Sequence, residues 1–401
     1  MNKKKESKVV PNVRFKGFTD DWKQRKLGDV SEIIGGGTPS TNHPEYWDGD
    51  IDWYSPAEIL DQIYVKRSRR RITQLGYDNS SAKLLPPGTV LFTSRAGIGK
   101  TAILSQKSCT NQGFQSIVPH ENQLDTYFIF SRTNELKRYG ELVGAGSTFA
   151  EVSGKQMSAM NLMLPTTIQE QQLIGQFFKK LDCLITLHQQ KITRLIKLKK
   201  AMLEKMFPKK GSVIPEIRFN GFVNAWEQRK FEDMAVRSSE ISSETILPRV
   251  EYEDIISGTG CLNKNIFDKE SCKNGIIFHK GDVLYGKLRP YLQNWLLPSF
   301  NGIAVGDFWV LKPQNVDSSF LYILIQSRKF DEIANQSTGT KMPRADWNLV
   351  SKSKFFIPCT VDEQATIGTY FKRLDNLITL HQRKIDMLKK LKSACLSEMF
   401  I

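Results

Sequence analysis

Two pairs of segments recur along this chain, and the duplication limits what the chain can fold into. Residues 11–30 align without gaps to residues 215–234 and keep 10 of 20 residues. Residues 168–207 match residues 361–400 at 24 of 40 positions. The offsets are 204 and 193 residues, so the stretch between the repeated segments is 11 residues shorter in the second copy. Self-similarity at long offset indicates repeated structural units. We therefore expect two similar frames that enclose two different inserts.

The longer repeat predicts one long helix in each copy. Beyond Gly175 and Gly368 neither copy contains Gly or Pro, and apolar residues recur at spacings of three and four. The predicted seams hold apolar residues and one histidine each: Ile185, His188, Ile192 and Leu195 in the first copy, and Ile378, His381, Ile385 and Leu388 in the second. Polar seam residues usually fix register and pairing, so we expect no catalytic or metal-binding role for the histidines.

The resulting fold class is α+β, with two mixed α/β domains separated by two long helices that pack as an antiparallel coiled coil with a pseudo-twofold axis. The inserts contain apolar runs such as TVLFTS and DVLYGK, punctuated by Gly and Pro. The predicted boundaries are, in chain order, an N-terminal basic segment at 1–11, a first variable domain at 12–165, a helical repeat at 166–208, a linker at 209–214, a second variable domain at 215–358 and a second helical repeat at 359–401.

The order of these segments is circular. Phe207 is followed by a short linker and the motif PEIRFNGF, while the second copy of the helix ends in the same Met-Phe pair and the chain begins with PNVRFKGF after a basic stretch. The end of the second helix could therefore lead into the start of the first unit, and we expect residues near the two ends of the chain to lie close together.

Composition favours a nucleic-acid partner. The chain has 57 Lys and Arg against 42 Asp and Glu, a net charge of +15, which favours a polyanion. No apolar run approaches the roughly 20 residues that cross a bilayer, so we expect a cytoplasmic protein without a membrane partner. The six cysteines are scattered and the five histidines form no cluster, so we expect reduced thiols, no metal and no cofactor.

One stretch, SRAGIGKTAI at 94–103, nearly matches a phosphate-binding P-loop. A P-loop would end at Gly99, Lys100 and Thr101, but it requires a glycine where this chain has Ser94. The equivalent residues of the second copy, KLRPYLQ at 287–293, have neither glycine nor a Lys-Thr pair. A nucleotide site would thus lack a counterpart, and a loop that contacts a nucleic acid is the better interpretation.

The whole arrangement resembles a known family. The features are two variable domains alternating with two near-identical helices, the motif P-x-[VI]-R-F-x-G-F-x-x-x-W, the "EQ" helix ending in "MF", and GKLRPYL at 286–292. Together they are similar to the specificity subunit of type I restriction-modification systems. The resemblance implies a non-catalytic DNA-recognition subunit in which each variable domain is a target recognition domain for one half of a bipartite, asymmetric site on double-stranded DNA. It also implies that the helices set the spacer and dock two methyltransferase subunits, and that restriction subunits join further out.

The candidate DNA contacts are basic, hydroxyl and aromatic residues in paired loops. Glycines would let a backbone approach DNA closely, and Arg or Lys can contact phosphate or guanine. The candidates are Arg95, Lys100, Ser147 and Thr148 in the first domain, Lys287, Arg289, Tyr291, Lys341 and Arg344 in the second, and Arg69 and Arg70 in the basic run at 66–71. Trp47 and Trp53 are expected in a core.

Two alternatives remain at this point: a P-loop-like ATPase with a coiled coil, and a coiled-coil scaffold that binds only protein. Duplicated frames around divergent basic inserts argue against both. No H-E-x-x-H or G-x-S-x-G motif is present, and the only Pro-Pro pair, Pro86-Pro87, does not form a methyltransferase tetrapeptide. A helix over 182–206 would be about 37 Å long, close to one turn of B-DNA at ~34 to 36 Å.

Overall fold

A computed structural model describes residues 10–95, 97–145, 150–209, 211–244, 246–269, 271–336 and 342–401. It divides into two compact units. Unit 1 consists of Met1–Thr186 with Asp386–Ile401, and unit 2 of Leu187–Ile385. Each unit therefore combines one insert with parts of both long helices, α6 (Ile168–Lys205) and α10 (Val361–Glu398).

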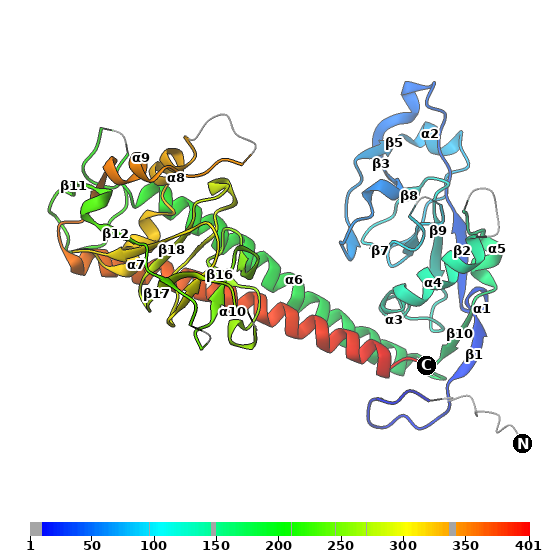
Figure 1. Cartoon of the computed structure of the whole chain (residues 1–401). Helices are drawn as coiled ribbons and strands as arrows, with labels where there is room; N and C mark the ends of the chain where they lie inside the picture. Colours follow the sequence, from blue (N-terminus) through cyan, green and yellow to red (C-terminus); the bar gives the residue numbers. More distant parts are fainter. Residues whose placement is uncertain are drawn as a thin grey trace, which may run out of the picture. The chain divides into compact units, whose positions relative to one another are not determined.

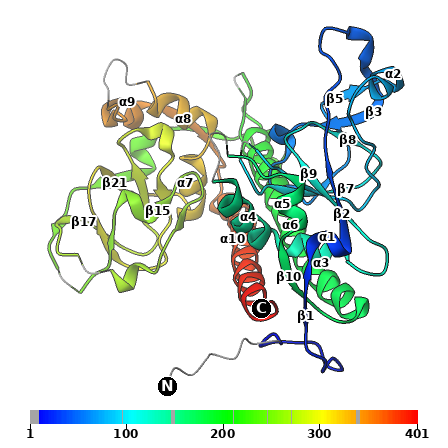
Figure 2. The ribbon, with the colours of Figure 1, turned by 90° about the vertical axis from the view of Figure 1, so that its right-hand side faces the viewer.

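The main sheet of unit 1 has five strands in the order β2-β9-β6-β7-β4. They are β2 (Ser31–Gly35), β9 (Gln115–Pro119), β6 (Val90–Phe92), β7 (Thr101–Leu104) and β4 (Tyr64–Val65). A second sheet has the order β5-β3-β8, with β5 (Arg70–Ile72), β3 (Trp47–Tyr54) and β8 (Cys109–Thr110). A strand pair joins β1 (Lys23–Lys26) to β10 (Asn161–Leu164). The second sheet and the β1-β10 pair lie at opposite ends of the unit (Figures 1 and 2).

The described part of unit 1 also contains the α-helices α1 (Leu27–Val30), α2 (Gln74–Asp78), α3 (Thr126–Ser131), α4 (Thr133–Gly144) and α5 (Gly154–Ser158). The side chain of Asp125 caps α3 by accepting a hydrogen bond of 2.8 Å from the Phe128 amide, which satisfies a free donor at the start of the helix. Asp317 caps the first helix of the second insert in the same way, at 3.0 Å from the Phe320 amide.

Unit 2 repeats the order of the main sheet as β12-β21-β18-β19. These strands are β12 (Ala235–Ser238), β21 (Phe308–Pro313), β18 (Val283–Gly286) and β19 (Trp295–Leu296). They are the repeat counterparts of β2, β9, β6 and β7. Each insert therefore contains its own sheet with the same strand order, although the sequences of the two inserts align only in fragments.

The rest of unit 2 differs from unit 1. A second sheet has the order β13-β17-β20-β14, with β13 (Ile241–Ser242), β17 (Gly275–Phe278), β20 (Gly302–Ala304) and β14 (Arg249–Val250). Two strand pairs follow: β15 (Ile255–Ile256) with β16 (Cys261–Leu262), and β11 (Glu227–Lys230) with β22 (Lys354–Ile357). The helices are α7 (Ser318–Leu324), α8 (Arg328–Ala334) and α9 (Trp347–Lys352). α8 and α9 lie side by side at one end of the unit, away from β17 (Figures 1 and 2).

The two long helices run antiparallel inside each unit. In unit 2, His188 and His381 form a hydrogen bond of 3.0 Å between their Nδ1 atoms. Further along the same pair, Lys199 Nζ lies 2.7 Å from Asp375 Oδ1. His188 and His381 are repeat counterparts of each other, so the helix pair is locally two-fold at this contact.

Unit 1 contains the counterpart of the ion pair in unit 2. Lys392 Nζ lies 2.6 Å from Asp182 Oδ1, and these residues are 193 positions from Lys199 and Asp375. Asp182 also accepts a hydrogen bond of 2.9 Å from the hydroxyl of Tyr127, which ties the helix to the first insert.

A buried clamp holds the entry motif of each unit against its helix. In unit 1, Arg14 donates two hydrogen bonds of 2.6 and 2.8 Å to the carboxylate of Glu170, and Trp22 Nε1 donates one of 3.3 Å to the same group. In unit 2, Arg218 and Trp226 bind Glu363 in the same way, with N–O distances of 2.7, 2.7 and 3.2 Å. Both carboxylates are almost fully buried. The hydrogen bonds and charges of these carboxylates raise the pKa values of Arg14 and Arg218 above their usual value, against the effect of burial.

The segment that begins each insert binds the C-terminal end of the long helix from the other repeat. In unit 2 the Ile217 amide donates to the carbonyl of Lys205 at 2.9 Å, and in unit 1 the Val13 amide donates to that of Glu398 at 2.9 Å. The ring of Phe207 packs edge-on against Trp226, and Phe400 packs edge-on against Trp22. Residues near the two ends of the chain therefore lie together, as the circular order predicts.

Candidate nucleic-acid interface

The P-loop-like stretch of unit 1 is the turn of a β-hairpin between β6 and β7. The turn closes on Thr93, whose hydroxyl donates to the Gly97 carbonyl at 2.6 Å and accepts from the Lys100 amide at 2.9 Å. Gly97 and Gly99 have φ angles of +72° and +92°. A Cβ on Gly99 would lie 2.3 Å from Lys137 Cγ, so the turn requires glycine there.

This geometry does not support a nucleotide site. A P-loop lies between a strand and a helix and directs its amides at a phosphate. Here residues Thr101–Leu104 form strand β7. The Gly99 amide donates to the Thr93 carbonyl at 3.0 Å, and the Lys100 amide is bound by the Thr93 hydroxyl. The two amides are thus used inside the turn.

Both predicted contacts on this turn are exposed. Lys100 has an exposed side chain. Arg95 Nε lies 2.8 Å from Glu151 Oε1, and both side chains of this ion pair face solvent. The Val152 amide donates to the Ser94 carbonyl at 2.9 Å, which brings Glu151 and Val152 beside the turn. Ser147 and Thr148 lie outside the described residues.

The second loop, residues 287–293 of unit 2, makes the same backbone hydrogen bond to its neighbouring segment as the turn of unit 1. The Ala345 amide donates to the Lys287 carbonyl at 2.8 Å, and these residues are each 193 positions from Val152 and Ser94. By the same offset, Leu288 and Arg344, which form a β-bridge, stand where unit 1 has Arg95 and Glu151. One frame thus carries different side chains in the two units.

A carboxylate organises the basic residues of the second loop. Arg344 Nη2 lies 3.0 Å from Asp307 Oδ2, and Lys287 Nζ lies 3.4 Å from Asp307 Oδ1. Burial favours the neutral carboxyl, but these two cations hold the pKa of Asp307 below its usual value. The backbone amide of Arg289 donates a hydrogen bond of 2.7 Å to the Pro343 carbonyl, which fixes the backbone of the loop at this residue. Lys341 lies outside the described part of the chain.

Arg70 is the first residue of strand β5, in the sheet of β5, β3 and β8, and Arg69 directly precedes that strand. Both are exposed. The guanidinium carbon of Arg70 stacks 3.6 Å from the ring centroid of Trp47. Trp47 and Trp53 are buried and pack edge-on at 5.2 Å, which confirms that they are core residues.

The seam residues cover one face of each long helix. Between residues 183 and 200, all of which are described, the residues that are not exposed are Ile185, His188, Ile192, Leu195 and Lys199. On α10, Ile378 and His381 are partly buried and Ile385 and Leu388 are buried. Burial, followed by the nearby charges of His188, Lys191 and Lys384, holds the pKa of His381 below its usual value.

The comparison with protein families is decisive. The family described as the type I restriction modification DNA specificity domain matches residues 19–197 and 224–390. The chain belongs to this family. It is a DNA-recognition subunit of a type I restriction-modification system, and the fold class expected from the duplication is confirmed.

Individual specificity subunits resemble this chain over much of its length. The type I restriction enzyme MjaIX specificity subunit of Methanocaldococcus jannaschii is 27% identical over 412 residues, which cover 94% of this chain and 92% of the relative. The EcoR124I/EcoR124II specificity subunit of Escherichia coli is 30% identical over 200 residues, 48% of each chain. The crystal structure of the S subunit from M. genitalium is similar with a TM-score of 0.65 and 13% identity, over 98% of this chain and 99% of that one; this likeness shows the fold.

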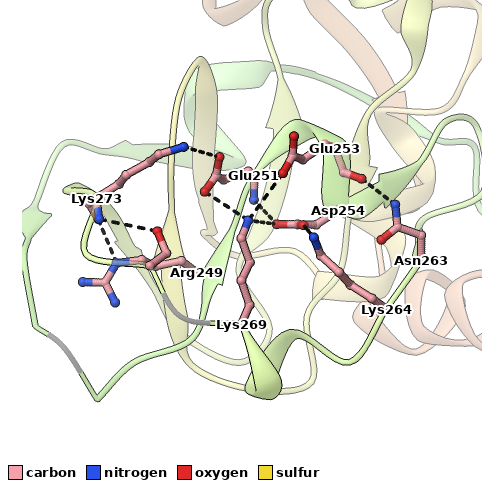
Figure 3. Close-up of polar contacts among 9 residues, drawn as sticks. Arg249, Glu251, Glu253, Asp254, Asn263, Lys264, Lys269 and Lys273 are labelled. Carbon is pink, nitrogen blue, oxygen red and sulfur yellow. Dashed lines mark hydrogen bonds and ion pairs between the residues drawn. The ribbon is translucent and has the colours of Figure 1, made fainter.

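Some of the positive charge of this specificity subunit is used inside unit 2 rather than offered to a partner. The buried carboxylate of Asp254 binds Lys264 and Lys269 with O–N distances of 2.7 and 2.8 Å, and Glu251 binds Lys273 at 2.8 Å (Figure 3). Burial favours the neutral form of Asp254, but the two lysines hold its pKa below the usual value. Sequence reasoning missed this cluster, since the charges come from three separate segments.

Two further features of the molecule concern metal binding and membrane insertion. Among the residues that the structure describes, no three His, Cys, Asp or Glu side chains come close enough to hold a metal ion. No helix in the described ranges is both long enough and apolar enough to cross a membrane.

Proposed function

We propose that each unit reads one half of a bipartite, asymmetric DNA site, through target recognition domains at residues 12–165 and 215–358. The observation that carries the proposal is the shared frame of the two loops. The hydrogen bonds from Val152 to Ser94 and from Ala345 to Lys287 match residue for residue, whereas the side chains on that frame differ. A common support with different contact groups is what two readers of different sequences require.

The ion pairs of the loops fit this role. Arg95 with Glu151 is exposed on both sides, and such surface pairs contribute only about 0 to 1 kcal/mol. A guanidinium held this weakly can exchange its carboxylate for a phosphate or a guanine edge at little cost. In unit 2 the Arg344 side chain is also exposed, but its partner Asp307 is partly buried and also binds Lys287, so this guanidinium is held more firmly. Lys100, Lys287 and Arg289 supply further charge. The remaining proposed contacts are Ser147, Thr148, Tyr291 and Lys341, with Arg69 and Arg70 following the phosphate backbone.

The long helices provide the second part of the proposal. They set the spacer between the half-sites and dock two methyltransferase subunits, and restriction subunits join further out. Because the two copies of the helix repeat match at 24 of 40 positions, each copy can bind the same partner. In this cytoplasmic complex methylation, ATP hydrolysis and cleavage are performed by the partner subunits.

A domain exchange tests the independence of the readers. Residues 31–160 are replaced by the matching insert of a related specificity subunit, and the methylated sequence is mapped genome-wide in a host that expresses the methyltransferase. One half of the recognised site should change, while the other half and the spacer stay the same. The reciprocal exchange in the second domain is the matched control and should change the other half. A change in both halves from a single exchange would overturn the proposal.

A further inference from the structure

An apolar tip projects from the second candidate DNA loop. A short 3₁₀ helix, Pro290–Leu292, follows strand β18. Tyr291 is 56% exposed and Leu292 is 38% exposed, whereas Pro290 beneath them is buried. The tip thus presents an aromatic ring and an aliphatic side chain to solvent next to basic residues.

The backbone holds this tip rigidly. The tip is flanked by Arg289 and Gln293, which both adopt the left-handed conformation, with φ angles of 48° and 56°. Residues other than glycine rarely adopt it unless the surroundings enforce it. The surroundings do so here: the Arg289 amide donates to Pro343 at 2.7 Å, and the Gln293 carbonyl accepts from the Gly258 amide at 3.0 Å. The hydroxyl of Ser257 donates to the Leu292 carbonyl as well.

Unit 1 treats the equivalent position differently. Ile98 stands 193 residues before Tyr291, but it packs inward against α4. A Cβ placed on Gly140 or Gly144 would lie 3.0 or 3.1 Å from Ile98, so the two glycines of α4 make room for this side chain. The first loop therefore presents glycine backbone and Lys100, whereas the second presents an aromatic ring.

The charge around the tip indicates its occupant. Lys287, Arg289 and Arg344 lie on the loop or on the segment bonded to it. Within the described part of the chain, Asp307 is the acidic residue that pairs with Lys287 and Arg344. A partner with a negatively charged rim and an apolar interior fits this pattern, and a DNA base step flanked by phosphates has both. The tip is also continuous with the loop that the proposed function assigns to DNA.

We propose that Tyr291, supported by Leu292, inserts as a wedge at a base step of the half-site read by the second domain and partly unstacks it. The first half-site is read without insertion. The second half-site is thereby selected in part by how easily it deforms, which adds specificity at a step that no hydrogen bond reads. This inference rests on the proposed DNA-recognition function.

The test uses the full chain in complex with its methyltransferase partners and a mapped recognition site. 2-Aminopurine is placed in turn at each step of both half-sites except at the methylated bases, because a methyltransferase extrudes its target base from the stack. Its fluorescence reports unstacking. The wild type should raise fluorescence at one step of the second half-site and at no equivalent step of the first. Tyr291→Ala should abolish the signal and weaken binding by about 5- to 150-fold, the range expected for loss of one base–aromatic stack.

Two variants separate the ring from other effects. Tyr291→Phe keeps the ring and should keep both signal and affinity. Phe267→Ala removes another exposed aromatic ring of unit 2 and should change neither. Thermal melting of each variant checks the fold, which the removal of an exposed ring should preserve.

The outcomes distinguish the inference from its premise. If the wild-type complex fails to bind its mapped site, the proposed function fails. If it binds and Tyr291→Ala alters neither fluorescence nor affinity, the wedge is overturned. Loss of methyltransferase co-purification with Tyr291→Ala, with DNA affinity of the assembled complex unchanged, would make the tip a protein contact and also overturn it.

Discussion

A chain that ends at Phe207 should assemble as a symmetric dimer, because it lacks the residues that complete its own unit. In the full chain the ring of Phe400 lies 6.3 Å from that of Trp22, and Met399 beside it is buried. The half-chain carries the same pair as Met206 and Phe207. Two copies can therefore exchange these ends, each copy filling the site that Met399 and Phe400 occupy in the full chain.

The structure sets the scale of this association. Burying one Met and one Phe contributes roughly 3 to 6 kcal/mol per site, so two sites contribute about 6 to 12 kcal/mol. Each site also regains an ion pair, with Lys199 of one copy binding Asp182 of the other, and the helix seam adds further burial. Association costs about 4 to 15 kcal/mol. The balance predicts a concentration-dependent dimer with an affinity near micromolar, about 8 kcal/mol.

Sedimentation from about 0.1 to 100 µM checks this range. Phe207→Ala is the decisive control, because in the half-chain this ring packs only against the other copy. Its loss at two sites costs about 6 to 10 kcal/mol of association free energy. The variant should therefore be monomeric. With the methyltransferase, the dimer should methylate a palindromic, interrupted site built from the first half-site. A folded half-chain that stays monomeric, or a Phe207→Ala dimer of unchanged affinity, would refute the circular architecture.

Three further outcomes follow from the buried clamp, the histidine pair and the first loop. Glu170→Gln should destabilise unit 1 by about 3 to 5 kcal/mol in urea unfolding, because it leaves a partly buried guanidinium without the buried carboxylate that pairs with it. Glu363→Gln should do the same to unit 2. A loss below about 1 kcal/mol would contradict a stabilising role of this ion pair. The pKa of His381 is lowered in the folded state, so the unfolded chain binds more protons below about pH 6.5 and stability should fall with acidification by up to about 1.4 kcal/mol per pH unit. Unfolding at about pH 7.5 and 5.5 measures this, and His381→Gln should remove that part of the slope. Lys100→Ala should weaken DNA binding by the complex and reduce the slope of affinity against salt by about one phosphate, measured by fluorescence anisotropy at several salt concentrations; nucleotide binding that disappears with Lys100 would oppose this assignment.

The helices and their pairing could be predicted because the duplication gives the same register twice. An offset of 193 residues relates His188 to His381 and Asp182 to Asp375, so the seam pattern already places the two histidines at equivalent positions. The sequence shows the common strand order of the inserts only in short fragments such as TVLFTS and DVLYGK, since exposed strand positions and connecting loops tolerate change.

The candidate site was harder to predict, because its geometry depends on contacts between distant segments. The hydrogen bond from Val152 to Ser94 spans 58 residues, and no local pattern encodes it. The carboxylate of Glu151 opposite Arg95, and the left-handed conformation of Arg289, have no signal in a single sequence for the same reason. The resemblance of residues 94–101 to a P-loop fails because a strand, rather than a helix, follows the glycines.

The closure of unit 1 by residues 398–400 has a consequence for synthesis on the ribosome. Domains usually fold as they emerge, the N-terminal one first. Here unit 2 is complete once Ile385 has been made, whereas unit 1, which is begun first, waits for Phe400. Until then, Phe207 can occupy the site beside Trp22 in place of Phe400. This phenylalanine can come from the same nascent chain or from another chain that is translated from the same mRNA. Folding of unit 2, which sequesters Phe207 against Trp226, removes this competitor, so the second half of the chain protects the assembly of the first.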